Sequence, residues 1–198
     1  MSNISDDVLI ASLTLAGTVI AFFVREWMKR RMLRQMLFAE ICSFIAVIET
    51  MQLDSSFESL IKSPPQKWSY VSHEDYFTLF EANASGLGLD GETVSHVVAC
   101  YEFMKGARDA RRSAASWGAD NLELCRSELR RSADLLAHSL DEAAQATERL
   151  IKRDFRTGPM KRAMERILHS RQISEIAERW RTVADRPIPA DITRSMTS

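Results

Sequence analysis

The sequence predicts an all-α protein in which an N-terminal transmembrane helix continues into a cytoplasmic antiparallel helical bundle. Three observations favour this fold class. An apolar run lies near the N-terminus, apolar residues recur every three or four positions over long stretches, and the glycines and prolines fall mostly at the ends of those stretches. No stretch alternates apolar and polar residues for long enough to predict a sheet.

The apolar run extends from Val8 to Val24, which is 17 residues without a charge. As a helix it is about 25 Å long, near the lower limit for crossing a hydrocarbon core of about 30 Å. Its acidic start and bulky end are unlike a signal peptide. A buried core helix would carry a polar stripe, whereas this run has only hydroxyl groups that can bond to the preceding turn, at Ser12, Thr14 and Thr18. We therefore expect a membrane span.

Basic residues and one tryptophan follow the run and form the expected membrane anchor. They are Arg25, Trp27, Lys29, Arg30, Arg31 and Arg34. A tryptophan suits the headgroup layer, and clustered basic residues mark the cytoplasmic side of a span. The N-terminus is therefore expected outside, and everything after Arg25 in the cytoplasm.

The chain is expected to fall into five segments with a single folded domain. Residues 1–24 form a short outside N-terminus and the transmembrane helix, 25–35 a basic juxtamembrane segment, 36–156 the helical bundle, 157–186 a basic C-terminal helix, and 187–198 a disordered tail. The three cysteines are odd in number and widely spaced, so we expect reduced thiols.

The first helix is expected to run from about Ser5 to Gln52, because no breaker separates the span from the apolar stripe that follows. That stripe has the spacing of a bundle helix or coiled coil and consists of Leu37, Ile41, Phe44, Ile48 and Met51. Within the span, Ser12 with Ala16 and Gly17 with Ala21 are pairs of small residues that let two helices approach closely. A homodimer is one expectation, and use of the stripe wholly within the monomer is the other.

Capping residues and stripes place the remaining helices. A short helix is expected after a cap at Ser55, and another from Ser72 to Ala84. Asp90 should cap a helix that reaches about Ser116, with Gly86 as a helix C-cap before it. The longest helix of the bundle should run from Asp120 to about Phe155 and the last from Met160 to about Val183. The apolar stripe of the longest helix consists of Leu122, Cys125, Leu129, Ala133, Leu136, Leu140, Ala143, Thr147 and Leu150. The last helix has one stripe of Met160, Met164 and Ile167 and another of Ile173, Ile176, Trp180 and Val183.

Charge is distributed unevenly along the chain. Residues 25–34 hold 5 basic and 1 acidic side chains, residues 35–151 hold 10 basic and 18 acidic, and residues 152–186 hold 10 basic and 5 acidic. An acidic domain argues against a nucleic-acid binder. The basic C-terminal helix fits packing on the acidic bundle, or lying on the anionic inner leaflet with Trp180 at headgroup depth, or binding of nucleic acid or protein. The sequence leaves these alternatives open.

Two stretches, MLFAEI at 36–41 and FEANASGLGLDGETVSHVVACYEFM at 80–104, resemble a widespread group of uncharacterised bacterial single-span membrane proteins. The positions that match the pattern of the group are Glu40, Asn83, Leu87, Gly88, Leu89, Val97, Val98 and Tyr101. Cys100 departs from it, since an aromatic residue is more typical there. The resemblance implies a helical cytoplasmic domain on a single span in the bacterial inner membrane, and it implies no activity.

Chemistry-bearing motifs are scarce in the sequence. Glu92, His96 and Cys100 are spaced four apart on one helix face, but no second motif supplies the further ligands that a metal site needs. The sequence has no phosphate-binding glycine loop, no nucleophile elbow and no acid and base pair in a hydrolase context. We expect no catalytic residues, no metal and no cofactor, and a protein that is not an enzyme.

Two functions of different classes stay open at this point. The first is a membrane-tethered interaction or scaffold protein that contacts membrane lipid through its span and binds an unknown cytoplasmic protein. The second is a ligand sensor or enzyme with a pocket near His96, Cys100 and Tyr101. A packed, dry bundle favours the first, and convergence of these three side chains on a solvent-reachable cavity favours the second.

Overall fold

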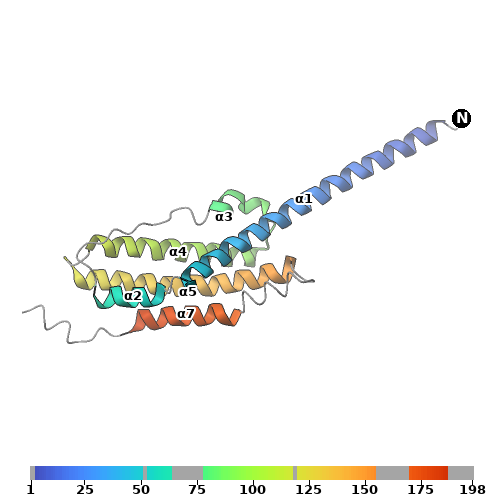
Figure 1. Cartoon of the computed structure of the whole chain (residues 1–198). Coiled ribbons are helices and arrows are strands. Elements are labelled where there is room, and N and C mark those ends of the chain that lie inside the picture. Colours follow the sequence, from blue (N-terminus) through green and yellow to red (C-terminus); the bar gives the residue numbers. More distant parts are fainter. Residues whose placement is uncertain (1–2, 51–52, 64–77, 118–119, 155–169, 187–198) are drawn as a thin grey trace, which may run out of the picture.

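A long first helix projects from one end of a bundle of shorter helices (Figure 1). The structure is a computed structural model that describes residues 3–50, 53–63, 78–117, 120–154 and 170–186. Every regular element within these ranges is a helix, so the predicted all-α fold is confirmed.

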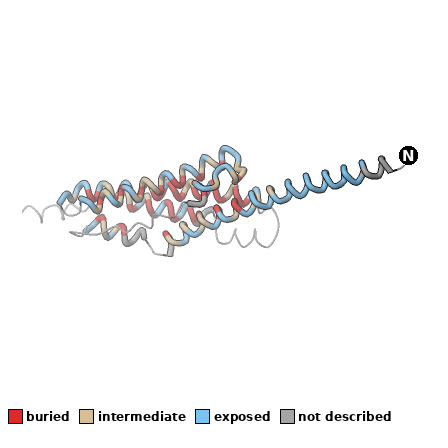
Figure 2. The backbone as a smooth tube through the Cα atoms, turned by 90° about the horizontal axis from the view of Figure 1, so that it is seen from above, coloured by how far each residue is buried: buried red, intermediate tan, exposed pale blue. Residues whose placement is uncertain are grey.

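Helix α1 (Asn3–Thr50) is a single helix of 48 residues, as expected from the absence of a breaker. Every side chain from Ile10 to Arg25 is exposed, and the hydroxyls of Thr14 and Thr18 donate to carbonyls one turn earlier at 2.8 and 2.9 Å, as predicted. Figure 2 shows α1 changing from exposed to partly buried where it enters the bundle. The first part of α1 is therefore exposed along its whole circumference, and the second part packs against the bundle on one face.

The second part of α1 packs its apolar stripe inside the monomer. Leu37, Ile41 and Ile48 are buried, and Phe44 is half-buried against the core. At these positions the stripe is used by the bundle of its own chain, and Met51 lies outside the described residues. A coiled coil between two copies along this stripe is therefore not available.

Helix α5 (Leu122–Asp154) is the central helix and contacts α1, α2 (Leu53–Lys62), α4 (Gly91–Trp117) and α7 (Ser170–Asp185). Its predicted stripe is buried at Cys125, Leu129, Ala133, Leu136, Leu140, Ala143, Thr147 and Leu150. Two serine hydroxyls of α5, those of Ser132 and Ser139, donate to carbonyls of α4 at 2.7 and 2.9 Å. Small residues at this contact let the two backbones approach closely, which makes α4 and α5 the most extensive helix pair.

Helix α2 begins at Leu53, two residues before the predicted cap at Ser55, so that cap is wrong. Phe57 and Ile61 anchor α2 in the core. The buried guanidinium of Arg126 donates to the carbonyls of Ile61 and Lys62, both at 3.1 Å, and so satisfies carbonyl groups that the end of α2 leaves open.

Helix α3 (Thr78–Asn83) and a 3₁₀ turn (Ala84–Gly86) precede α4, and the expected start at Ser72 lies outside the described residues. Gly86 is the last residue of the 3₁₀ turn and not the helix C-cap that we expected; among the described glycines, the positive φ of 59° belongs to Gly88. Asp90 caps α4 as predicted, because its Oδ1 accepts from the backbone N of Thr93 at 2.8 Å.

Helix α7 packs on α5 and α2, and its predicted face of Ile173, Ile176, Trp180 and Val183 is buried. The Trp180 ring meets the Phe57 ring edge-on, with centroids 5.3 Å apart. Ion pairs of Arg181 with Asp141 and of Arg186 with Glu58 join α7 and the residue after it to the acidic bundle. The alternative with Trp180 at headgroup depth is therefore wrong for α7, and the earlier stripe that starts at Met160 lies outside the described residues.

Candidate functional site

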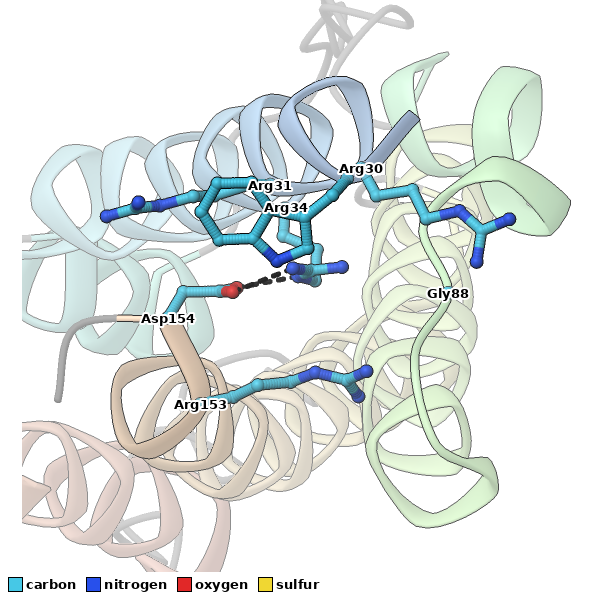
Figure 3. Close-up of a pocket in the computed structure, with 7 residues that line it drawn as sticks. Arg30, Arg31, Arg34, Gly88, Arg153 and Asp154 are labelled. Atoms are coloured by element: carbon cyan, nitrogen blue, oxygen red, sulfur yellow. Dashed lines mark hydrogen bonds and ion pairs between the residues drawn. The ribbon is translucent and has the colours of Figure 1, made fainter. Parts of the chain in front are cut away.

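A pocket of about 440 Å³ lies where α1 enters the bundle (Figure 3). Three separate segments line it: α1, the turn before α4, and the last residues of α5. The lining residues are Trp27, Arg30, Arg31, Arg34, Gly88, Arg153 and Asp154. Four of these seven residues are arginines and one is an acid, so the pocket carries a net positive charge.

Arg34 and Asp154 form the inner wall of the pocket. The Arg34 Nε and Nη2 atoms donate to the two carboxylate oxygens of Asp154 at 2.7 and 2.8 Å, and Nη1 donates to the Leu87 carbonyl at 2.9 Å. Both charged side chains are 6% exposed. Two parallel bonds of this kind fix the relative position of two segments, so Arg34 holds α1, α5 and the turn together.

The positive φ of the turn and its close approach to Arg30 of α1 both favour glycine at position 88. A Cβ built on Gly88 would lie 3.3 Å from the Cδ of Arg30, and the φ of 59° is itself strained for any other residue. Leu87, beside it, is fully buried at this end of the bundle. The pocket wall is therefore held in place by backbone geometry as well as by Arg34.

The other three arginines have weaker and more exposed partners. Arg30 Nε lies 3.1 Å from Glu26, and these side chains are 49% and 36% exposed. The Arg31 guanidinium lies over the Trp27 ring, 5.4 Å from its centroid. Arg153 reaches toward the Gly88 segment in Figure 3, and its Nη1 is 3.4 Å from Asp90. Exposed pairs of this kind contribute little stability, so these guanidinium groups can exchange partners.

The three residues of the predicted pocket face two different sides of α4. His96 and Cys100 face α5, where His96 Nδ1 is 2.7 Å from Glu142 Oε2 and Cys100 Sγ is 3.5 Å from Ser139 Oγ. Tyr101 faces α1 and donates to Glu40 Oε2 at 2.9 Å. None of the three lines the basic pocket, and a pocket near them stays a prediction.

Burial limits what Cys100 can do chemically. The residue is fully buried, and burial raises the pKa of its thiol to about 12. Since the thiolate is the nucleophile, a thiol in this state is a poor one at neutral pH.

The predicted face of Glu92, His96 and Cys100 is occupied by protein contacts. Glu92 pairs with Arg149, while the other two contact α5. Within the described ranges, no three His, Cys, Asp or Glu side chains gather closely enough to hold a metal ion.

Sequence reasoning placed Arg30, Arg31 and Arg34 in a membrane anchor but did not place them in a pocket. Spacings of four and three put Arg30 and Arg31 on nearly the same helix face as Arg34, which was the available signal. The contribution of Arg153 and Asp154, from the other end of the bundle sequence, had no local signal. In comparisons with protein-family models, with curated protein sequences and with solved structures, no match to the chain was found.

Proposed function

We propose that the chain is a single-pass membrane protein that serves as a membrane-tethered interaction protein, with its N-terminus outside and its helical domain in the cytoplasm. The resemblance to bacterial single-span proteins supports the bacterial inner membrane as its location. The observation that carries the proposal is α1, whose apolar residues are exposed on one half of the helix and packed in the bundle on the other.

The exposed half of α1 is long and apolar enough to cross a membrane. Large apolar side chains are exposed throughout it, including Phe22 at 64% and Phe23 at 66%. Contiguous apolar surface of this extent is unfavourable in water and marks contact with lipid or with another protein. The basic residues that follow support the orientation.

The topology has a direct test in single cysteines placed at Ser2 and at Ser195, with Cys42, Cys100 and Cys125 replaced by alanine. A membrane-impermeant maleimide applied to intact cells should label the Ser2→Cys variant, and should label the Ser195→Cys variant only after the membrane is permeabilised. The physical reason is the contrast between Asp6 and Asp7 before the run and the basic cluster after it. Labelling at position 195 in intact cells would overturn the orientation.

The outer face of α1 supports a second copy of the chain as one partner. Met28, Met32 and Met36 are 59%, 56% and 45% exposed on the side of α1 that turns away from the bundle. At about 100° per residue, Gly17 and Ala21 share this face within the span. A Cβ on Gly17 would meet nothing within 4 Å, so the helix surface there is open to another helix.

Replacing Gly17 by leucine should therefore weaken self-association of the full chain. The added side chain would hold two spans apart at their point of closest approach, and the dimer fraction should fall severalfold. Energy transfer between labelled copies in lipid vesicles, measured over a range of protein-to-lipid ratios, gives that fraction. Ala16→Leu is the matched control, because Ala16 lies about 100° around the helix from Gly17 and belongs to the other pair of small residues. A monomeric wild-type chain at every ratio, or an equal effect of both variants, would contradict this interface.

A further inference from the structure

The mouth of the basic pocket lies next to the lipid headgroup layer if α1 spans a membrane. Trp27 follows the last residue of the apolar run, Val24, by about 4.5 Å along the helix, and Arg30 and Arg31 follow Val24 by about 9 and 10.5 Å. The polar layer on each side of a bilayer is about 5 to 8 Å thick. Arginine side chains reach several ångströms along the helix, so the mouth of the pocket adjoins the headgroup layer.

The charge of the pocket favours an anionic ligand. Arg34 is neutralised by Asp154, which leaves Arg30, Arg31 and Arg153 around the opening. Two acids lie close to these arginines: Glu26 beside Arg30, and Asp90 beside Arg153.

Neither acid is a strong competitor for a ligand at this site. The pair of Glu26 and Arg30 is exposed to water on both sides. The carboxylate of Asp90 already accepts from the backbone N and the hydroxyl of Thr93 at 2.8 to 2.9 Å, and these hydrogen bonds lower the pKa of Asp90. The longer contact of 3.4 Å to Arg153 is therefore the one that a better acceptor would replace.

The groups that line the pocket match a phosphate ester in size and chemistry. A volume of about 440 Å³ lies within the range of small-molecule sites. Guanidinium groups bind phosphate through paired hydrogen bonds and do so better than ammonium groups. The bidentate bonds between Arg34 and Asp154 fix the segments that carry the arginines. The side chains of Arg30 and Arg31 point in different directions in Figure 3, so binding a ligand requires these exposed side chains to turn toward it, while the backbone stays in place.

We propose that this pocket binds the phosphate group of an anionic phospholipid from the leaflet that adjoins the bundle, with Arg30, Arg31 and Arg153 as its ligands. The inference rests on the proposed membrane anchoring. A lipid bound here would contact α1, the turn before α4 and the end of α5 together. The headgroup would then set the position of the bundle against the membrane surface.

The test uses the full chain in nanodiscs that contain equal amounts of phosphatidylglycerol and phosphatidylcholine, with retained lipid counted by native mass spectrometry. The wild-type protein should retain phosphatidylglycerol in preference to phosphatidylcholine. The double variant Arg31→Gln with Arg153→Gln should lower that preference by about 30-fold, since two guanidinium groups that bond the lipid phosphate directly are removed. The matched control is Arg25→Gln with Lys29→Gln, which removes two exposed charges of the same helix that do not line the pocket.

The outcomes separate the possible sources of phosphate. An equal loss of phosphatidylglycerol in both double variants would contradict binding in the pocket, because it would mean that the lipid is attracted by the general surface charge of the helix. The chain in pure phosphatidylcholine discs can also be titrated with glycerol phosphate in a calorimeter. Saturable binding there, together with no preference for phosphatidylglycerol in the mixed discs, would assign the pocket to a soluble phosphate ester and contradict the lipid as its ligand.

Alkaline carbonate extraction of membranes from cells that express the chain separates this inference from the proposed function. A chain that is extracted overturns both. A chain that stays in the membrane but retains no anionic lipid overturns the pocket inference alone.

Discussion

Replacement of Arg34 by methionine is expected to lower the free energy of unfolding of the helical domain by about 3 to 5 kcal/mol. The substitution removes the bidentate bonds to Asp154 and the bond to the Leu87 carbonyl, and it leaves the Asp154 carboxylate buried without a counter-charge. Thermal unfolding of the full chain in mild detergent, followed by circular dichroism, should show a midpoint about 10 °C lower.

Two comparison variants make this expectation specific to the buried ion pair. Arg30→Met breaks the exposed pair with Glu26 and should change the free energy by less than about 1 kcal/mol. Adding Asp154→Leu to Arg34→Met removes the stranded carboxylate and should restore most of the loss. Unfolding curves of Arg34→Met and Arg30→Met that coincide would show that Arg34 is not part of the folded domain.

Replacement of Trp180 by alanine should cost a similar amount, about 3 to 5 kcal/mol. The Trp180 side chain is fully buried, and its ring meets Phe57 of α2 at a centroid distance of 5.3 Å. The smaller side chain would leave a cavity between α7, α2 and α5. We expect a lower midpoint in urea and faster cleavage by trypsin at the arginines of α7, because the helix would detach more often.

Trp117 provides the matched control for this variant. It is 42% exposed at the end of α4, so Trp117→Ala should change stability by less than about 1 kcal/mol. Trypsin cleavage within α7 that is as slow in Trp180→Ala as in Trp117→Ala would contradict the packing of α7 on the bundle.

Much of the fold could be predicted from local signals in the sequence. The stripe from Cys125 to Leu150 is buried in α5 because helical spacing forces those side chains onto one face, and that face has to leave water. Asp90 caps α4 because a short acidic side chain can satisfy an open backbone N–H at a helix start. Both signals lie within a few turns of chain, so they do not depend on the tertiary structure.

The candidate site could be predicted only in part. The sequence marked Arg30, Arg31 and Arg34 as a basic cluster. It did not indicate that Arg34 would be buried while the other two would lie at the opening of the pocket. Arg34 is buried because Asp154, 120 positions later, meets it at the end of α5. The backbone reverses with a positive φ at Gly88 and not at Gly86, and this choice likewise depends on how the turn packs against Arg30.

The sequence by itself determined that the protein is all-helical, that α1 runs unbroken from the apolar stretch into the bundle, and which face of α5 is buried. Periodicity and capping decide these features, because both act between residues three or four positions apart. Only the tertiary structure decided that α7 packs on α5 rather than lying at the membrane surface, that Tyr101 and His96 serve different sides of α4, and that a basic pocket forms around Arg34. Those features depend on contacts between helices that are distant in sequence, and the energy of such contacts exists only once the helices are packed together.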